Sequence, residues 1–187
     1  MQRFFISGFL LCGLFFSNIA LSSNSSVLNL RISPAALALG AVNIEADIVL
    51  NRYYTIAPMY TLWNFESKSD FEADITAYGL RVDYHANRVF RQGLLYGMFV
   101  KRWDIDIQYV DNDKEVNSVV SVDTIGVTGG YRWMWRSFNV TAEFGYRLMV
   151  FNGFDFKLES GDETKVNVTD ISMMGGTVAD VSVGWVF

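Results

Sequence analysis

The chain has 187 residues, a length that suits a single domain. Its residues are 51% hydrophobic and 16% aromatic, yet no apolar run after residue 22 is long enough for a membrane-spanning helix. The formal net charge of −5 and the scattered basic residues argue against a nucleic-acid-binding protein.

Residues 1–22 have the pattern of a secretory signal peptide, so the mature domain is expected to span residues 23–187. Arg3 supplies the positive charge, residues 4–16 the apolar region, and residues 20–22 (ALS) the small residues of a cleavage site. The segment is rather short for a membrane anchor. Cys12 follows Leu11, where a lipoprotein signal would have a small residue. Because Cys12 is the only cysteine, the mature domain cannot form disulfides or use thiolate chemistry.

After the signal peptide the sequence predicts an all-β domain of eight strands. Apolar residues recur at alternate positions, as in strands with one apolar face, and no helical period of useful length appears. Pro58 cannot donate a ladder hydrogen bond and predicts a bulge or local irregularity. The expected strands are residues 27–34, 42–50, 53–63, 76–85, 94–108, 119–133, 138–150 and 177–187.

The two faces of these strands suggest a barrel with a polar interior. The polar face is rich in Gly, Ala and Thr with isolated charges, whereas a solvated face would be rich in Lys and Glu. The apolar face carries Tyr and Trp near strand ends, as the aromatic girdles of membrane barrels do. A water-soluble sandwich shows a similar alternation and remains the alternative. In hydrocarbon the sheet must close, so the prediction is a closed antiparallel eight-stranded transmembrane barrel.

The expected connections alternate in length along the chain. Short turns are expected at residues 51–52, 86–93 and 134–137, and long loops at residues 64–71, 111–115 and 151–176. In outer-membrane barrels the short turns face the periplasm and the long loops face outside. Both chain ends are therefore expected in the periplasm.

The last strand carries an outward series of apolar residues, Val183, Trp185 and Phe187. This ending resembles the C-terminal insertion signal of outer-membrane proteins, although Ser182 occupies a position where that signal prefers Gly. With the signal peptide and residues 41–50 (AVNIEADIVL), it makes the chain resemble the small outer-membrane barrels of the OmpA/OmpX type and a related barrel family of unknown function. The resemblance implies a monomer in a Gram-negative outer membrane, in contact with lipids and lipopolysaccharide and with the barrel-assembly machinery through its last strand. It transfers no activity.

The polar face places charged side chains inside the barrel. Buried charges must be paired, and we expect Glu143 to be compensated by Arg81 or another inward base near mid-height. These charges predict either a hydrogen-bonded plug that stiffens the barrel or, less in keeping with a narrow lumen of mixed charge, a gated pore or proton path. The expected lumen residues are Glu45, Asp47, Arg81, Asp83, Lys101, Arg132, Glu143, Arg147 and Asp180.

Two further motifs were considered as sites. His85 is the only histidine and could serve a Ser-His-acid hydrolase that acts on membrane lipid. However, no serine lies near His85 in the sequence. Residues 111–115 (DNDKE) have calcium-like spacing, but Val116 stands where a calcium loop has glycine. The sequence therefore predicts no catalytic residue, metal or cofactor. It predicts a structural and surface-interaction protein acting through its outer loops, with a lipid hydrolase or a small pore as alternatives.

Overall fold

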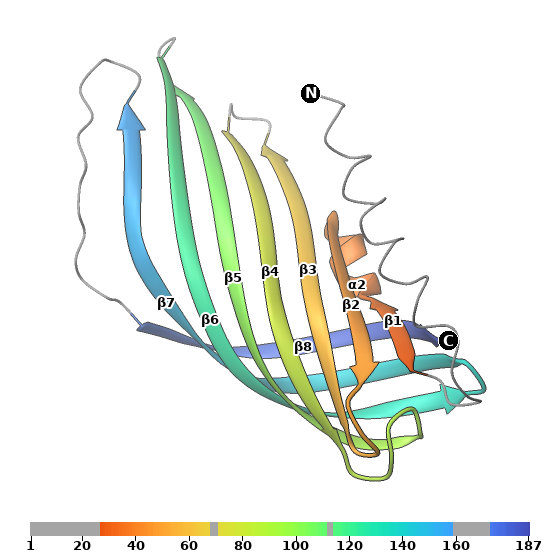
Figure 1. Cartoon of the computed structure of the whole chain (residues 1–187). Coiled ribbons are helices and arrows are strands. Elements are labelled where there is room, and N and C mark those ends of the chain that lie inside the picture. The colour runs from red at the N-terminus through yellow and green to blue at the C-terminus, as the bar shows by residue number, and fades with distance from the viewer. Residues whose placement is uncertain (1–26, 68–70, 112–113, 159–172) are drawn as a thin grey trace.

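The computed structural model describes residues 27–67, 71–111, 114–158 and 173–187 as an all-β closed barrel (Figure 1). The eight strands are antiparallel and follow one another around the barrel in chain order, which confirms the predicted all-β domain and its closed eight-stranded barrel. The predicted signal peptide lies outside the described residues. The elements are β1 (Leu28–Ile32), α2 (Pro34–Ala38), β2 (Ala41–Val49), β3 (Tyr54–Ser67), β4 (Phe71–His85), β5 (Gly93–Asp111), β6 (Lys114–Trp135), β7 (Phe138–Leu158) and β8 (Met173–Val186).

The barrel closes between its first and last strands. β1 pairs with β8 through four residues, from Asn29 opposite Val186 to Ile32 opposite Val183. The Phe187 amide donates to the Leu28 carbonyl at 2.8 Å, so the final residue continues the ladder. The beginning of β1 and the end of β8 therefore lie at the same end of the barrel, together with the connections at residues 50–53, 86–92 and 136–137. We call this the turn end.

One short helix interrupts the strands. α2 begins with Pro34 after the N-cap Ser33, whose hydroxyl accepts a hydrogen bond from the Ala36 amide at 3.3 Å. Gly40, with φ of 80°, takes the left-handed conformation that follows many helix ends. A single turn is too short to produce a periodic pattern, which is why the sequence did not predict it. In the described part of the chain no helix is long and apolar enough to cross a membrane.

The strands β3 to β7 extend farther from the turn end than predicted. Residues expected in the long loops are strand: Ser67 pairs with Phe71, and Asp111 pairs with Lys114. β7 likewise continues to Leu158, inside the third expected loop. The predicted contrast between short turns and long loops is therefore wrong for the first two loops. The third loop is reduced to a connection between Leu158 and Met173.

The ladders contain two local irregularities. At Pro58 the β2–β3 pairing is interrupted between Met59 and Ile56, which is the predicted irregularity, but the register is unchanged on either side, so there is no bulge. The pairing of β6 with β7 does shift in register, between Val120 and Val122 on β6. No sequence signal identified it.

The barrel is inverted relative to a water-soluble protein. Among the described residues, nine hydrophobic and seventeen polar or charged residues are buried. Large apolar side chains instead cover the outer face, including Met98 at 63% and Phe144 at 64% exposure. The apolar surface of this barrel therefore points outward around most of its circumference.

This inversion holds only for the part of the molecule nearer the turns. We call this part the lower barrel; it comprises β1, β2, β8 and the turn-side portions of β3 to β7. The remainder, which we call the upper sheet, consists of residues 63–67, 71–77, 102–111, 114–123 and 149–158. Figure 1 shows these portions of β3 to β7 rising past the ends of β1 and β2.

Candidate functional site

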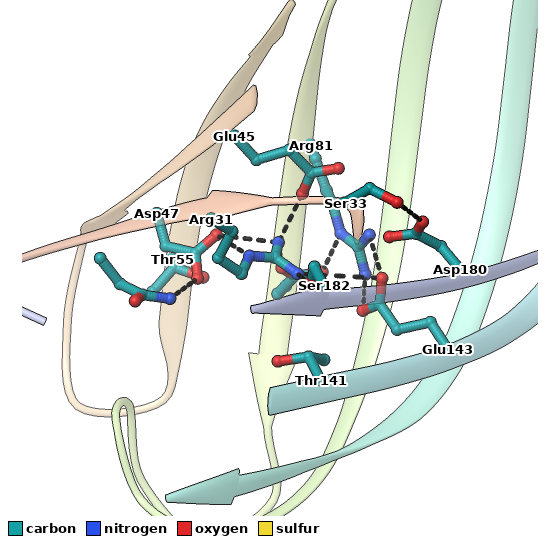
Figure 2. A network of polar contacts seen from close by, with 12 residues as sticks. Arg31, Ser33, Glu45, Asp47, Thr55, Arg81, Thr141, Glu143, Asp180 and Ser182 are labelled. Carbon is teal, nitrogen blue, oxygen red and sulfur yellow. Dashed lines mark hydrogen bonds and ion pairs between the residues drawn. The ribbon is translucent and has the colours of Figure 1, made fainter. Parts of the chain in front are cut away.

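The structure places all nine predicted lumen residues on the inner face of the barrel. Six of them are buried: Glu45, Asp47, Arg81, Asp83, Arg132 and Glu143. The other three, Lys101, Arg147 and Asp180, are half-buried and lie farther from the turn end. The six buried charges form one connected network, drawn in part in Figure 2.

The centre of this network is Arg31, which sequence reasoning missed. Its side chain is fully buried, and Nη2 lies 2.6 Å from Glu45 Oε2 and 2.9 Å from Asp47 Oδ1. Asp83 and Glu143 lie farther away, with closest atoms at 3.7 and 3.9 Å. Arg31 therefore sits among four carboxylates, of which Figure 2 labels Glu45, Asp47 and Glu143. The signal was present in the sequence, because Asn29, Arg31 and Ser33 alternate with apolar residues as lumen positions do.

Arg81 forms the second part of the network, on β4. Its Nε donates to Asp83 Oδ1 at 2.5 Å, and its Nη1 donates to Glu143 Oε2 at 2.6 Å. A second bond, from Nη2 to Glu143 Oε1, makes the Arg81–Glu143 pair bidentate. Nη2 also donates to the Thr128 hydroxyl at 2.9 Å. Arg81 thus joins β4 to β6 and β7 across the lumen.

Arg132 forms the third part, toward the turn end. Its Nη2 donates to Asp47 Oδ2 at 2.7 Å, and its Nε donates to Thr141 at 3.1 Å. Asn29 donates to the same Asp47 oxygen at 2.9 Å and accepts from Asn139 at 2.7 Å. Asp47 is therefore bound by three donor residues, Asn29 and Arg31 on β1 and Arg132 on β6.

The charges inside the barrel balance. Among the residues whose side chains the structure describes, five basic and five acidic side chains lie on the inner face, so their formal charges cancel. An eight-stranded barrel is just wide enough for side chains to fill. Because the network crosses the lumen from five strands, β1, β2, β4, β6 and β7, a passage through it would require these bonds to break. The basic residues are Arg31, Arg81, Lys101, Arg132 and Arg147, and the acidic ones Glu45, Asp47, Asp83, Glu143 and Asp180.

His85 is buried in the lower barrel, at the turn-side end of β4. Its Nε2 lies 3.1 Å from the Thr55 hydroxyl, on the neighbouring strand. In the described residues no hydrogen bond joins its ring to a serine or a carboxylate. The geometry of a Ser-His-acid hydrolase is therefore not assembled around His85 in this part of the chain.

No metal centre is found in the part of the chain that the structure describes, where no group of three or more His, Cys, Asp or Glu side chains could hold an ion. The calcium-like motif at residues 111–115 lies partly outside the described residues.

The last strand has the orientation expected of an insertion signal. Trp185 and Phe187 point outward with 53% and 61% exposure, and Val183 is half-buried between them and Val181. Ser182 points inward instead and accepts a hydrogen bond from Arg31 Nη1 at 3.3 Å. The serine that departs from the signal's usual glycine thus contributes to the lumen network.

Comparison with proteins of curated function finds no match for this chain. A family model does match, over residues 10–187, and its description gives no activity. The matched residues include every described strand and every residue of the lumen network. The chain therefore belongs to the family described as "Protein of unknown function (DUF3575)".

Proposed function

We propose that this protein is an outer-membrane β-barrel with a closed lumen, acting as a structural and surface-interaction protein rather than an enzyme. The observation that carries the proposal is the inverted lower barrel, with a paired charge network inside and large apolar side chains outside. A bilayer is the environment in which such an outer face is stable. In water it would be an apolar patch far larger than monomers expose.

Aromatic residues on the outer face support this placement. Near the turn end, exposed rings form one group that includes Tyr54, Trp133 and Trp185. Farther along the strands, Tyr60 and Tyr78 pair across β3 and β4 and are also exposed. Two aromatic levels separated by aliphatic side chains are typical of barrels that contact both interfaces of a membrane.

The orientation rests on the upper sheet. Its outer face carries charged residues such as Asp74, Arg102 and Asp106, which belong in water. In outer-membrane barrels the longer extramembrane part faces outside. The proposal therefore places the upper sheet at the cell surface and the turn end, with Phe187, in the periplasm.

This arrangement defines the proposed partners. The outer apolar band contacts lipids and lipopolysaccharide, and Val183, Trp185 and Phe187 of the last strand serve as the signal for the barrel-assembly machinery. The upper sheet and its connections form the contact surface toward the exterior.

Cysteine labelling in intact cells tests the orientation. Asp106→Cys, on the outer face of the upper sheet, should react with an impermeant thiol reagent. Arg88→Cys, exposed at the turn end, should react only after the outer membrane is opened. Cys12 lies in the predicted signal peptide, so it should not compete. Labelling of both in intact cells would contradict a membrane location, and the reversed pattern would contradict the orientation.

Planar-bilayer recording tests the closed lumen. The wild-type protein should show no discrete conductance steps, because the network of Arg31, Arg81 and Arg132 crosses the lumen. Discrete conductance steps in the wild-type protein would favour a pore instead. Release of fatty acid from lipopolysaccharide that is lost in His85→Ala would favour the hydrolase.

A further inference from the structure

The inner face of the barrel changes from polar to apolar at a similar distance from the turn end on each long strand. On each long strand, going away from the turns, a polar or small inward residue is followed by an apolar one: Thr61 by Trp63, Lys101 by Trp103, and Thr124 by Val122. Beyond this level the inner face of the upper sheet includes Ile75, Ala77, Ile105 and Val120, all buried or half-buried. The upper sheet therefore presents an apolar concave face above the polar plug. We call it the upper cup.

The barrel wall is incomplete beside the upper cup. β1 ends at Ile32, which lies opposite Ile44 on β2 and Val183 on β8. The residues of β8 that precede Val183 therefore pair only with β7. In the described residues the space between β2 and β8 above this point is spanned by α2, which contacts both strands. The cup is thus bounded by a ladder on one side and by a single helical turn on the other. A chain-like ligand could enter from the side without breaking a β-ladder.

The floor of the cup holds polar groups that the lower network leaves without partners. Thr124 is 3% exposed, yet its hydroxyl has no hydrogen-bond partner, and the buried Nε of Arg147 has none either. Lys101 Nζ donates to Thr61 at 2.7 Å and lies 4.5 Å from the centre of the Trp103 ring. In the described residues no carboxylate lies within 4.0 Å of the Lys101 or Arg147 nitrogens.

Lys101, Thr124 and Arg147 lie close together because of the strand register. Lys101 is directly opposite Thr124 across β5 and β6, and Thr124 is opposite Met149, two residues along β7 from Arg147. Arg147 is close enough to act electrostatically on Lys101, as are Glu45 and Asp180. Glu45 is already paired with Arg31 at 2.6 Å, so the two cations of the floor share one further carboxylate, that of Asp180, and these three groups have a formal charge of +1. The floor therefore suits a monoanion better than a doubly charged phosphate.

We propose that the upper cup binds a long-chain fatty-acid anion. The carboxylate rests on the floor and accepts hydrogen bonds from Lys101, Thr124 and Arg147, which satisfies the two orphaned donors. The acyl chain lies along Trp103, Ile105 and Val122 on the inner face of the upper sheet.

The test is a binding titration with cis-parinaric acid, a fluorescent polyunsaturated fatty acid, on the full mature protein in a neutral detergent. Energy transfer from tryptophan to the probe reports binding, and Trp103→Phe should reduce the transfer. Saturable transfer that oleate displaces better than oleyl alcohol is the expected result. Lys101→Gln and Arg147→Gln should each weaken binding about 10-fold, the usual effect of removing a hydrogen bond to a charged group.

Two further variants serve as controls. Arg102→Gln changes a cation next in sequence to Lys101 but on the outer face, and it should bind like wild type. Val122→Glu places a charge beside the acyl chain and should abolish binding, while far-ultraviolet circular dichroism shows that the barrel remains folded.

Several outcomes would overturn the proposal. They are the absence of saturable transfer in the folded wild-type protein, equal displacement by oleate and oleyl alcohol, and equal losses in Lys101→Gln and Arg102→Gln. A failure here leaves the proposed outer-membrane function standing, because that function depends on the outer face of the lower barrel and is tested by cysteine labelling.

Discussion

The lower barrel and the upper sheet are built from the same strands with their faces exchanged. In the lower part of β5, Met98 and Val100 point outward and Lys101 points inward. In its upper part, Arg102 and Asp104 point outward and Trp103 points inward. No bulge accompanies the exchange on β5, whose pairing with β4 and β6 continues without a register shift. The change lies in the sequence pattern alone. It shows that the surroundings of each half, rather than strand geometry, decide which face is apolar.

The largest difference in stability between the two halves is expected when one cation is removed from each. Arg31→Ala in the lower barrel leaves four carboxylates around an empty position, and breaking a buried pair costs about 3–5 kcal/mol. Arg102→Ala on the outer face of the upper sheet removes an ion pair that is nearly half exposed, worth at most about 1 kcal/mol. Urea unfolding in lipid vesicles measures both.

Equal losses for the two arginine variants would show that the upper and lower charges share one environment. The lumen network would then not be the buried structure described above. Glu143→Ala, which deprives Arg81 of its bidentate partner, should fall in the same range as Arg31→Ala.

A second comparison places one new charge on the outer face of each half. Phe144→Arg in the lower barrel should cost about 2–4 kcal/mol, because the residue is 64% exposed toward the proposed acyl chains. Val119→Arg in the upper sheet is also outward and exposed, but in water it should cost only a few tenths of a kcal/mol. Phe144→Leu is the matched apolar control and should be mild. If both arginine variants were mild, the lower barrel would lie in water.

A smaller loss than for Arg31→Ala or Phe144→Arg is expected at Ser33, which follows β1 and caps α2. Its hydroxyl caps α2 and donates to Asp180 Oδ1 at 2.7 Å. Ser33→Ala should therefore cost about 1 kcal/mol, within the range for a lost N-cap. Ser33→Asn, which keeps a capping side chain, should restore part of this loss in the same unfolding experiment. A loss as large as that of Arg31→Ala would mean that α2 holds the lower barrel closed.

The eight strands and their closure could be predicted because strict alternation needs no long-range information. The same is true of the lumen charges, whose inward positions follow from the alternation once the apolar face is taken as the outer one. Arg31 was overlooked because β1 has only five residues and a short stretch gives a weak pattern.

Part of the upper sheet, including residues 64–67, 71–75, 109–111 and 114–118, was not predicted as strand, for a physical reason. Where the outer face becomes polar, as at Glu72 and Asp74 on β4, the segment as a whole gains the composition of a loop. The alternation continues there with inward Ala73 and Ile75, but with its outer face reversed in polarity. An interpretation that assumed one apolar face along the whole strand therefore began this strand only at Thr76, although on β5 the predicted strand continued to Gln108.

The closure of the barrel by its own chain ends has a consequence for folding kinetics. The bond between Arg31 and Ser182 joins residues 151 positions apart, so the chain entropy lost on forming it is among the largest in the molecule. Contacts between residues this far apart in the sequence form late, because strands that follow one another in the sequence close shorter loops and lose less chain entropy when they pair. Until β1 and β8 meet, Arg31 has its carboxylates on β2 but no partner on β8. The pairing of β1 with β8 therefore does two things in one step. It completes the hydrogen bonds of Arg31 at the centre of the lumen, and it removes the last open strand edges. The final closure is therefore cooperative.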